Sequence, residues 1–428
     1  MADWNESDYR RRVVDDELDF LLGALPAVSL EGPRAVGKTW TAQRRARTVY
    51  NLDDPATLAL IQANPDRLTQ GEEPIFIDEW QRYPPAWDLV RRAVDTRSTP
   101  GRFLLAGSTA PATPPTHSGA GRIVTLRMRP LSIYERQIEV PSVSLQELLD
   151  GGRPPLSGHT DVALERYADE VCTGGFPGWR SADPKVQRAV FGGYLDRAVD
   201  HDVALMGHRA RQPSVVRRWL TAYAAATSTT ATYETIRDAA TSGQGDKPAK
   251  STTIAYRDLL EAMWLVTPVQ AWWSAGNPLS RLKRGPKHHL ADPALAARLL
   301  DVTAGDLLSA APATVGAFHP GPLLGALFES LVTLSIEVYG QAAGARVSHL
   351  RTWNDTREVD LIVQGHQRML AMEIKLVSTP TRRDTRHLRW IAEQMDPEVV
   401  DTVIVTTGQH AYRDQDGIAV VPAALLGP

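Results

Sequence analysis

The sequence predicts an α/β protein of several domains whose first domain is a parallel sheet covered by helices on both faces. Three apolar runs in the first third, at 27–30, 74–77 and 102–106, are typical of buried strands, and helical stretches alternate with them. Alternation of this kind favours a parallel sheet. A chain of 428 residues is also long enough for two or three domains.

Sequence patterns divide the chain into four predicted parts. The first domain is predicted to span 1–150, because a Pro- and Gly-rich stretch follows it. A helical connecting region is predicted at 151–212. Three helices and two short strands with a basic connection then predict a winged-helix domain at 213–312. The last part, 313–428, is predicted to contain a helix, a β-hairpin, a basic helix and a further strand.

Composition limits the environment and the partners of the protein. A single cysteine excludes a disulfide framework and favours a reducing cytoplasm. No apolar run reaches about 20 residues, and the charged N-terminus lacks the apolar core of a signal peptide, so we expect a cytoplasmic protein without a membrane partner. The net charge is −3, but 205–295 holds 12 Lys or Arg against 6 Asp or Glu. This basic middle predicts a localised anion-binding surface.

The most specific motif is a phosphate-binding loop between the first strand and the following helix. It fits G-x-x-x-x-G-K-[ST] at every fixed position, and its residues are Gly32, Pro33, Arg34, Ala35, Val36, Gly37, Lys38 and Thr39. The glycines let backbone N–H groups surround phosphates, while Lys38 is expected to bridge the β- and γ-phosphates. The Thr39 hydroxyl is expected to hold Mg²⁺. No Asn-Lys-x-Asp motif occurs, which favours ATP over GTP.

Residues after the next two strands complete the predicted nucleotide site. Asp78 and Glu79 follow the second strand, where Asp78 is expected to hold Mg²⁺ and Glu79 to polarise the attacking water. Ser108 follows the third strand and is either a sensor of the γ-phosphate or an ordinary loop residue. Arg122 follows a flexible loop and is either an arginine finger, in cis or from a neighbouring subunit of a homo-oligomer, or a surface residue.

A second candidate site lies in the predicted hairpin near the C-terminus, EVDLIVQGHQRMLAMEIK (358–375). A two-residue turn at 366–367 makes paired positions sum to 733, which places Asp360 opposite Glu373 with Lys375 on the same face. Opposed carboxylates are repulsive unless a cation such as Mg²⁺ or Mn²⁺ lies between them. Glu329 on the preceding helix is a candidate third ligand. The alternative is a site without metal, where Lys375 pairs with an acid.

Basic residues in the predicted winged helix form a candidate DNA surface. Their charge and spacing suit phosphate contacts of low sequence specificity. They are Arg217, Arg218, Arg281, Lys283, Arg284 and Lys287. Trp272 and Trp273 precede the basic stretch and either stack on bases or close a domain core.

Taken in order along the chain, these motifs resemble bacterial and archaeal AAA-superfamily ATPases of the AAA_14/DUF4143 type. The motifs that carry the resemblance are GPRAVGKT, IFIDEWQRYPPAW, LLAGS, GRIVTLRMRPLSIYE, TGGFPGW, YLDRAVDHD and the hairpin. The resemblance implies a P-loop ATPase core, a helical and winged-helix middle, and a C-terminal α/β domain similar to the PD-(D/E)xK restriction-endonuclease fold. Ser108 departs from the Asn that many AAA ATPases have at this position.

Three functions fit these observations. The first is an ATP-hydrolysing, DNA-binding protein that acts as a DNA remodeller or a helicase-like motor. The second is a metal-dependent DNA endonuclease regulated by the ATPase. The third is a nucleotide-gated signalling or defence switch whose partner is a protein.

Overall fold

The first sheet has five strands, all parallel, in the order β2-β3-β4-β1-β5. The computed structural model describes residues 9–109, 119–202, 213–241, 249–273, 285–309, 320–352, 356–395 and 397–428. The strands are β1 (Ala27–Glu31), β2 (Thr48–Asn51), β3 (Ile75–Asp78), β4 (Phe103–Gly107) and β5 (Val124–Arg127). The predicted α/β class is confirmed, and β2 and β5 add two strands to the three predicted.

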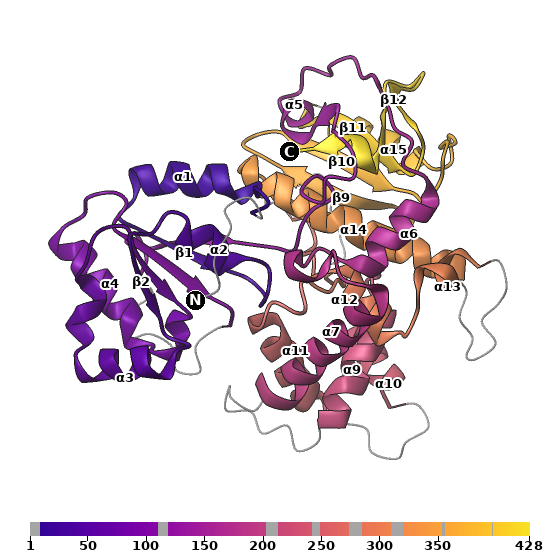
Figure 1. Cartoon of the computed structure of the whole chain (residues 1–428). Coiled ribbons are helices and arrows are strands. Elements are labelled where there is room, and N and C mark those ends of the chain that lie inside the picture. The colour runs from indigo at the N-terminus through magenta and orange to yellow at the C-terminus, as the bar shows by residue number, and fades with distance from the viewer. Residues whose placement is uncertain are drawn as a thin grey trace.

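Helices cover both faces of this sheet because its central strands are apolar on both sides. Alternate residues such as Leu30 and Leu104 belong to the core beneath α1 and α2, while Phe103 and Leu105 pack against the opposite helices. The helices are α1 (Val14–Ala24), α2 (Lys38–Gln43), α3 (Pro55–Ala63) and α4 (Pro85–Thr96). This domain is the indigo and purple part of Figure 1.

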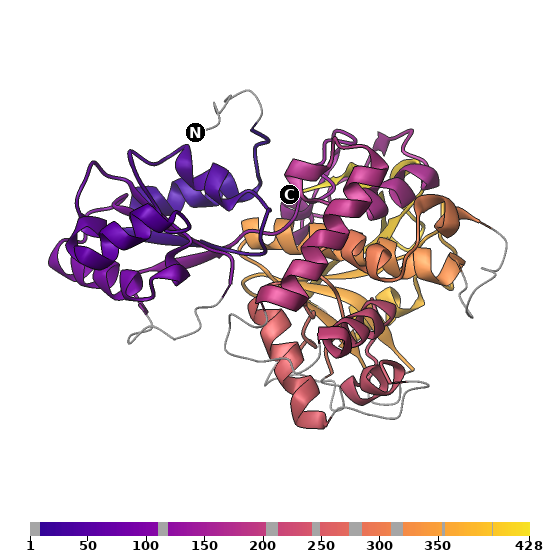
Figure 2. The ribbon, with the colours of Figure 1, turned by 60° about the horizontal axis from the view of Figure 1, so that its bottom comes forward.

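A helical region follows the first domain and lies beside it in Figures 1 and 2. Its helices are α6 (Leu164–Thr173), α7 (Pro184–Arg197), α9 (Pro213–Ala225), α10 (Tyr233–Ala239), α11 (Lys250–Ala262), α12 (Pro293–Leu299) and α13 (Ala304–Leu308). Isolated antiparallel bridges join Val266 to Leu290 and Val269 to Lys287 after α11. The order of three helices and a short antiparallel pair matches the one predicted, and the assignment as a winged helix stays a prediction.

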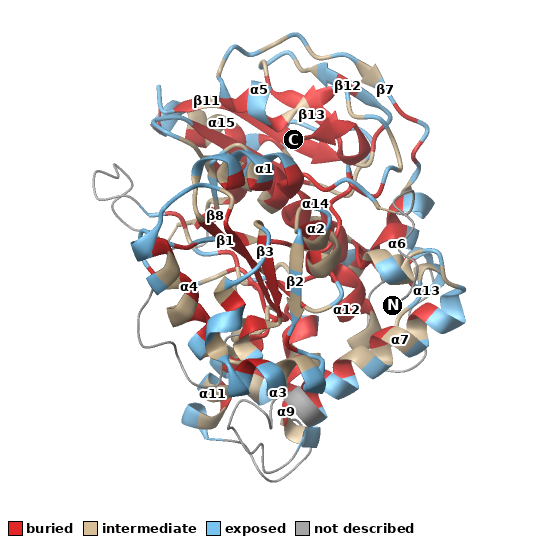
Figure 3. Cartoon of the chain, turned by 60° about the vertical axis from the view of Figure 1, so that its left-hand side comes forward, coloured by how far each residue is buried: buried red, intermediate tan, exposed pale blue. Residues whose placement is uncertain are grey.

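The C-terminal part contains a mixed seven-stranded sheet in the order β7-β12-β13-β11-β10-β9-β8. Its strands are β7 (Gly158–His159), β8 (Arg346–Arg351), β9 (Glu358–Gln364), β10 (Met369–Ile374), β11 (Val399–Thr406), β12 (His410–Arg413) and β13 (Ala419–Pro422). The helices α14 (Pro320–Ala342) and α15 (Arg386–Gln394) belong to this part. Burial is highest in the central strands of both sheets, which are red in Figure 3.

The segment between the first domain and the helical region packs against the C-terminal sheet. In it, β6 (Val143–Ser144) pairs with β14 (Leu426–Gly427), α5 (Leu145–Leu149) contacts β10 and β11, and β7 joins the sheet edge. The predicted limit of the first domain at 150 therefore falls inside a segment that the structure attaches to the other end of the chain.

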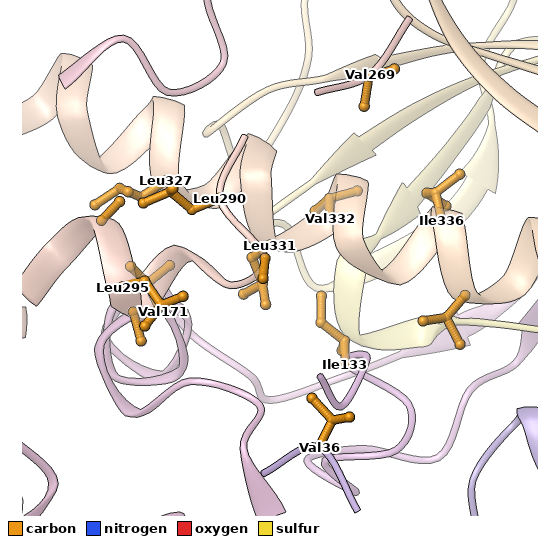
Figure 4. Close-up of a cluster of buried hydrophobic side chains, with 14 of the residues drawn as sticks. Val36, Ile133, Val171, Val269, Leu290, Leu295, Leu327, Leu331, Val332 and Ile336 are labelled. Atoms are coloured by element: carbon orange, nitrogen blue, oxygen red, sulfur yellow. The ribbon is translucent and has the colours of Figure 1, made fainter. Parts of the chain in front are cut away.

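Helix α14 connects the parts of the molecule. Its residues Leu327 and Leu331 lie near Leu290 and Leu295 of the helical region (Figure 4). On the same helix, the Ser335 hydroxyl accepts from Ile133 N at 3.0 Å. The stretch 321–342 of this helix is apolar enough and long enough to cross a membrane. The sequence analysis did not identify it as such a stretch. In the structure, however, 67% of its most apolar window is buried inside the protein. A buried core helix has the same composition.

Candidate nucleotide site and C-terminal carboxylate cluster

The phosphate-binding loop runs from the carboxyl end of β1 to the first turn of α2, as predicted. A Cβ atom at Gly32 would lie 2.0 Å from the carbonyl oxygen of Met128, so only glycine fits there. Gly37 has a left-handed backbone with a φ of 101° directly before Lys38. The two glycines thus shape a loop whose N–H groups and helix N-terminus suit an anion.

Lys38 lies folded into this loop. Its Nζ donates hydrogen bonds to the carbonyl oxygens of Gly32 and Pro33, both at 2.8 Å, and the side chain is buried. Burial lowers the pKa of Lys38 to about 8, although the carboxylates of Glu79 and Asp78 oppose this shift. An ammonium in this position is ready to exchange the two carbonyls for phosphate oxygens.

Thr39 and Asp78 meet at the end of β3. The Thr39 hydroxyl donates to Asp78 Oδ2 at 2.9 Å, and burial raises the pKa of Asp78 to about 6. A hydroxyl and a carboxylate side by side beside a phosphate loop are oxygen ligands of the type that Mg²⁺ prefers. The residues present therefore fit the magnesium ion that a P-loop fold implies.

Glu79 is held in position by two neighbours. The Ser108 hydroxyl donates to Glu79 Oε2 at 2.8 Å, and the Gln81 amide donates to the same oxygen. Glu79 itself has a left-handed backbone with a φ of 51°, which is uncommon outside glycine and is often found at functional sites. Ser108 thus contacts the predicted water-polarising carboxylate, a geometry that suits a sensor at the end of β4.

A cavity of about 790 Å³ lies beside the phosphate loop. The first domain contributes Lys38, Thr39 and Glu79, and Tyr9 and Trp40 also line it. The helical region contributes Pro177, Gly178 and Arg197. Arg197 belongs to the YLDRAVDHD motif, but sequence reasoning gave it no role in the site, since only the fold places it beside the phosphate loop. The cavity is therefore shared by two parts of the chain.

A buried ion pair supports the phosphate loop from behind, and sequence reasoning missed it as well. Arg12 donates from Nε to Glu135 Oε1 at 3.0 Å and from Nη1 to the Val36 carbonyl oxygen at 2.7 Å. Glu135 also accepts from Val13 N, Ser132 N and the Ser132 hydroxyl at 2.8–2.9 Å. This contact gives the GRIVTLRMRPLSIYE motif a role, because it fixes the loop against the preceding arm of the chain.

Arg122 lies at the wrong end of the sheet for an arginine finger in cis. It precedes β5, which runs parallel to β1, so it is next to the amino end of β1 while the phosphate loop follows the carboxyl end. Arg122 Nε donates to Asp95 at 2.9 Å. The prediction in cis is therefore wrong for geometric reasons, and a role in a neighbouring subunit stays a prediction.

The C-terminal hairpin has the predicted register. Gln364 pairs with Met369 and Leu361 with Met372, so paired positions sum to 733, and Gly365 N donates to the Arg368 carbonyl oxygen across the turn. Continuing this register places Asp360 opposite Glu373. The two carboxylates share the Lys375 ammonium, at 3.1 Å from Asp360 and 2.6 Å from Glu373.

A second lysine, which the sequence pattern assigned to DNA, completes this cluster. Lys287 Nζ lies 2.9 Å from Glu329 Oε1, 3.0 Å from Asp360 Oδ1 and 3.3 Å from Glu358 Oε1. The ammonium groups hold the pKa of Asp360 well below its usual range. Burial raises the pKa of Glu329 to about 8 and that of Glu373 well above its ordinary value.

The divalent cation predicted for this cluster does not fit its arrangement. Glu329, Asp360 and Glu373 converge as predicted, but two ammonium groups lie between their oxygens. Among the described residues, no three His, Cys, Asp or Glu side chains are grouped so that they could hold a metal ion. The alternative that Lys375 pairs with an acid describes the geometry better.

Comparison with known proteins assigns the first domain. Residues 25–137 match the family model AAA_14, described as an AAA domain. The chain carries an AAA domain. Residues 324–426 match DUF4143 and residues 164–306 match DUF8612, both described as domains of unknown function. The limits of the DUF8612 match enclose most of the predicted winged helix together with α6 and α7.

Relatives of known sequence, and one solved structure, align with most of this chain. Uncharacterized proteins of Mycobacterium tuberculosis and Mycobacterium bovis are 27% identical over 421 residues, which is 96% of this chain and 83% of theirs. A Walker-type ATPase of Pyrococcus abyssi is 17% identical, with a TM-score of 0.41 over 69% of this chain and 97% of its own.

The predicted DNA-binding residues of the DUF8612 region are not one exposed surface. Lys287 is 1% exposed and bound to three carboxylates, so its prediction as a DNA contact is wrong. Arg217 pairs with Asp196, and Arg218 is half-buried on the same helix. The remaining three, Arg281, Lys283 and Arg284, lie outside the described residues.

Of the two neighbouring tryptophans, Trp272 closes a core, which is one of the two predicted alternatives. It packs against Leu350 and Val359 of the DUF4143 sheet, and its indole N–H donates to Gln364 Oε1 at 3.1 Å. Trp273 is 60% exposed.

Proposed function

We propose that this protein binds and hydrolyses ATP with Mg²⁺ at the AAA domain, in the cytoplasm. The observation that carries the proposal is the arrangement of Lys38, the Thr39–Asp78 pair and the Ser108–Glu79 pair at the end of the first sheet. Together these groups can bind phosphate, hold Mg²⁺ and align a water, which is what phosphoryl transfer to water requires. The match to an AAA domain supports the same activity.

Each side chain has a distinct role in this proposal. Lys38 neutralises the β- and γ-phosphate oxygens, and Thr39 and Asp78 hold Mg²⁺, which neutralises charge on the same phosphates. Glu79 accepts a hydrogen bond from the attacking water and aligns it with the γ-phosphorus atom. Ser108 keeps the Glu79 carboxylate in place. Catalysis then rests on positioning and on electrostatic stabilisation.

Arg197 gives the site a link to the rest of the chain. A nucleotide whose phosphates draw this guanidinium inward would tighten the contact between the AAA domain and α7. Domain contacts of this kind change with ligand because the ligand binds one arrangement better than the other. ATP binding and hydrolysis would in this way alter the packing of the DUF8612 region.

The direct test is steady-state phosphate release with ATP and Mg²⁺ by the full chain. We expect Lys38→Ala to abolish turnover and Lys185→Ala, a matched substitution of an exposed lysine on α7, to leave it unchanged. GTP serves as a second substrate and is expected to be used less well. Turnover by Lys38→Ala equal to that of the wild type would sink the proposal.

We further propose that DNA is the partner whose contact the nucleotide controls. The excess of basic residues in 205–295 supports this. Among the predicted DNA-binding residues other than Lys287, Arg281, Lys283 and Arg284 lie close together in sequence, and these three would be substituted by alanine. A control set of three exposed arginines on the AAA domain is Arg47, Arg67 and Arg92.

DNA affinity measured over a salt series separates the two sets. Each lost phosphate contact lowers the slope of log K against log salt by about 0.9, so the triple alanine variant should lose about 2.7. The control set should change the slope little. Absence of DNA binding at low salt would leave a protein partner, and hence a nucleotide-gated switch, as the better proposal.

A further inference from the structure

We infer that the carboxylate cluster of the DUF4143 domain is an ionic lock, in which Lys287 of the DUF8612 region occupies the place that a nuclease would give to a divalent cation. The lock consists of Glu329, Glu358, Asp360 and Glu373 with Lys287 and Lys375. It does not depend on the proposed ATP hydrolysis. It assigns the cluster to holding two domains together and removes metal-dependent DNA cleavage from this site.

The coordination of Asp360 carries the first step. Its Oδ1 lies 3.0 Å from Lys287 Nζ, while its Oδ2 accepts from Lys375 Nζ at 3.1 Å and from the Ile374 backbone N–H at 3.0 Å. Both oxygens of the central carboxylate are therefore occupied by donors. A Mg²⁺ ion needs oxygens at about 2.1 Å, and it would have to enter the space that the Lys287 ammonium fills.

The charge of the lock points the same way. Four carboxylates face two ammonium groups, and the Arg351 guanidinium lies 3.8 Å from Glu358 Oε2, so the cations balance most of the negative charge. Buried carboxylates without a partner are very unfavourable, which is why the lysines are needed. The cluster thus reaches near-neutrality without a metal ion.

Lys287 is fixed by its backbone as well as by its side chain. Its N–H donates to the Val269 carbonyl oxygen and its own carbonyl accepts from Val269 N–H, both at 2.9 Å. The next residue, His288, donates from N to the Thr229 carbonyl oxygen at 2.9 Å. Backbone pairing on both sides fixes the position from which the side chain reaches the cluster. The side chain itself is 1% exposed and is held by its three carboxylate partners.

The surrounding contacts show what the lock joins. Ala271 forms a bridge with His349 at the edge of β8, and Trp272 N–H donates to the His349 carbonyl oxygen at 2.6 Å. The pair of segments 266–273 and 287–290 therefore lies against the DUF4143 sheet. From this pair, Lys287 reaches across to form ion pairs with three of the four carboxylates of the lock.

The test is thermal unfolding of the full chain with and without MnCl₂. Lys287→Met keeps the length of the side chain and removes its charge. We expect its unfolding midpoint to fall by roughly 5–10 °C, because a buried carboxylate cluster loses a partner. Mn²⁺ should then raise the midpoint of Lys287→Met by filling the vacated space. The surface variant Lys185→Met should behave as the wild type.

Two further measurements distinguish the lock from a metal-dependent nuclease site. The double variant Lys287→Met/Asp360→Asn should lose the extra stabilisation by Mn²⁺, which separates this cluster from the Mg²⁺ site of the AAA domain. Wild-type protein should nick plasmid DNA with Mn²⁺ no faster than Asp360→Asn does. Nicking by the wild type that Asp360→Asn abolishes would overturn the inference, and so would a Lys287→Met variant as stable as the wild type. If Lys287→Met does not fold, the comparison of wild type with Asp360→Asn decides alone.

Discussion

The ion pair between Arg12 and Glu135 is expected to be essential for both stability and nucleotide binding. The two side chains are 3% and 1% exposed, and Glu135 accepts hydrogen bonds from four donors. Glu135→Gln keeps the shape of the side chain. It leaves the Arg12 guanidinium without a counterion and turns an NH₂ group toward two hydrogen-bond donors.

The magnitude follows from these contacts. Breaking a buried ion pair by removing one charge costs about 3–5 kcal/mol, and each unsatisfied buried donor costs about 1–3 kcal/mol as part of the same change. Taking about 3 kcal/mol as the lower value, the unfolding midpoint of the AAA domain should fall by roughly 6–12 °C. Nucleotide affinity should fall too, because Arg12 also holds the Val36 carbonyl of the phosphate loop.

Two assays on the full chain check this. Thermal unfolding gives the midpoint, and titration with a fluorescent ATP analogue gives the dissociation constant. Glu72→Gln, at an exposed glutamate of the same domain, is the matched control. A Glu135→Gln variant whose midpoint and affinity equal those of Glu72→Gln would refute the reasoning that this pair supports the loop.

Three other predictions concern single residues. Burial lowers the pKa of His349 to about 4, with Lys287, Glu358 and Arg351 nearby. Between about pH 6.5 and 4 only the unfolded chain binds this proton, so the free energy of unfolding should fall by up to about 1.4 kcal/mol for each pH unit that the pH drops. Denaturant titrations at several pH values should show a smaller slope for His349→Gln. Arg197→Ala should weaken ATP affinity roughly tenfold without lowering the unfolding midpoint, and unchanged affinity would remove Arg197 from the site. Ser108→Ala should lower kcat roughly tenfold with little change in KM, since it frees the Glu79 carboxylate; an unchanged kcat in the same phosphate-release assay would show that this hydrogen bond is not used.

Local patterns were sufficient to predict which residues meet at the phosphate loop and the register of the hairpin. The phosphate loop is a contiguous motif. Asp78 ends β3 and Ser108 follows β4, and the carboxyl ends of these neighbouring parallel strands meet at one edge. The hairpin register needed only the length of the turn and the two-residue period of a strand. In both cases residues close in sequence, or fixed by the order of strands, determine the geometry.

The remaining contacts depend on how distant segments pack, which no local pattern encodes. Lys287 lies in a basic stretch and looks like a surface residue until the fold places it beside Glu329 and Asp360. Arg12 and Glu135 are 123 positions apart in the sequence. Arg122 was assigned by its position after a loop, and only the direction of β5 shows that it lies at the opposite sheet end.

The most direct test of ATP hydrolysis at this site is a comparison of binding and turnover in Glu79→Gln. In the proposed mechanism, Lys38, Thr39 and Asp78 hold the nucleotide with its Mg²⁺, whereas Glu79 acts on the attacking water. We therefore expect Glu79→Gln to bind ATP with wild-type affinity and to hydrolyse it at least about 100-fold more slowly. Hydrolysis at the wild-type rate by this variant would contradict the assignment of Glu79 and with it the proposed mechanism.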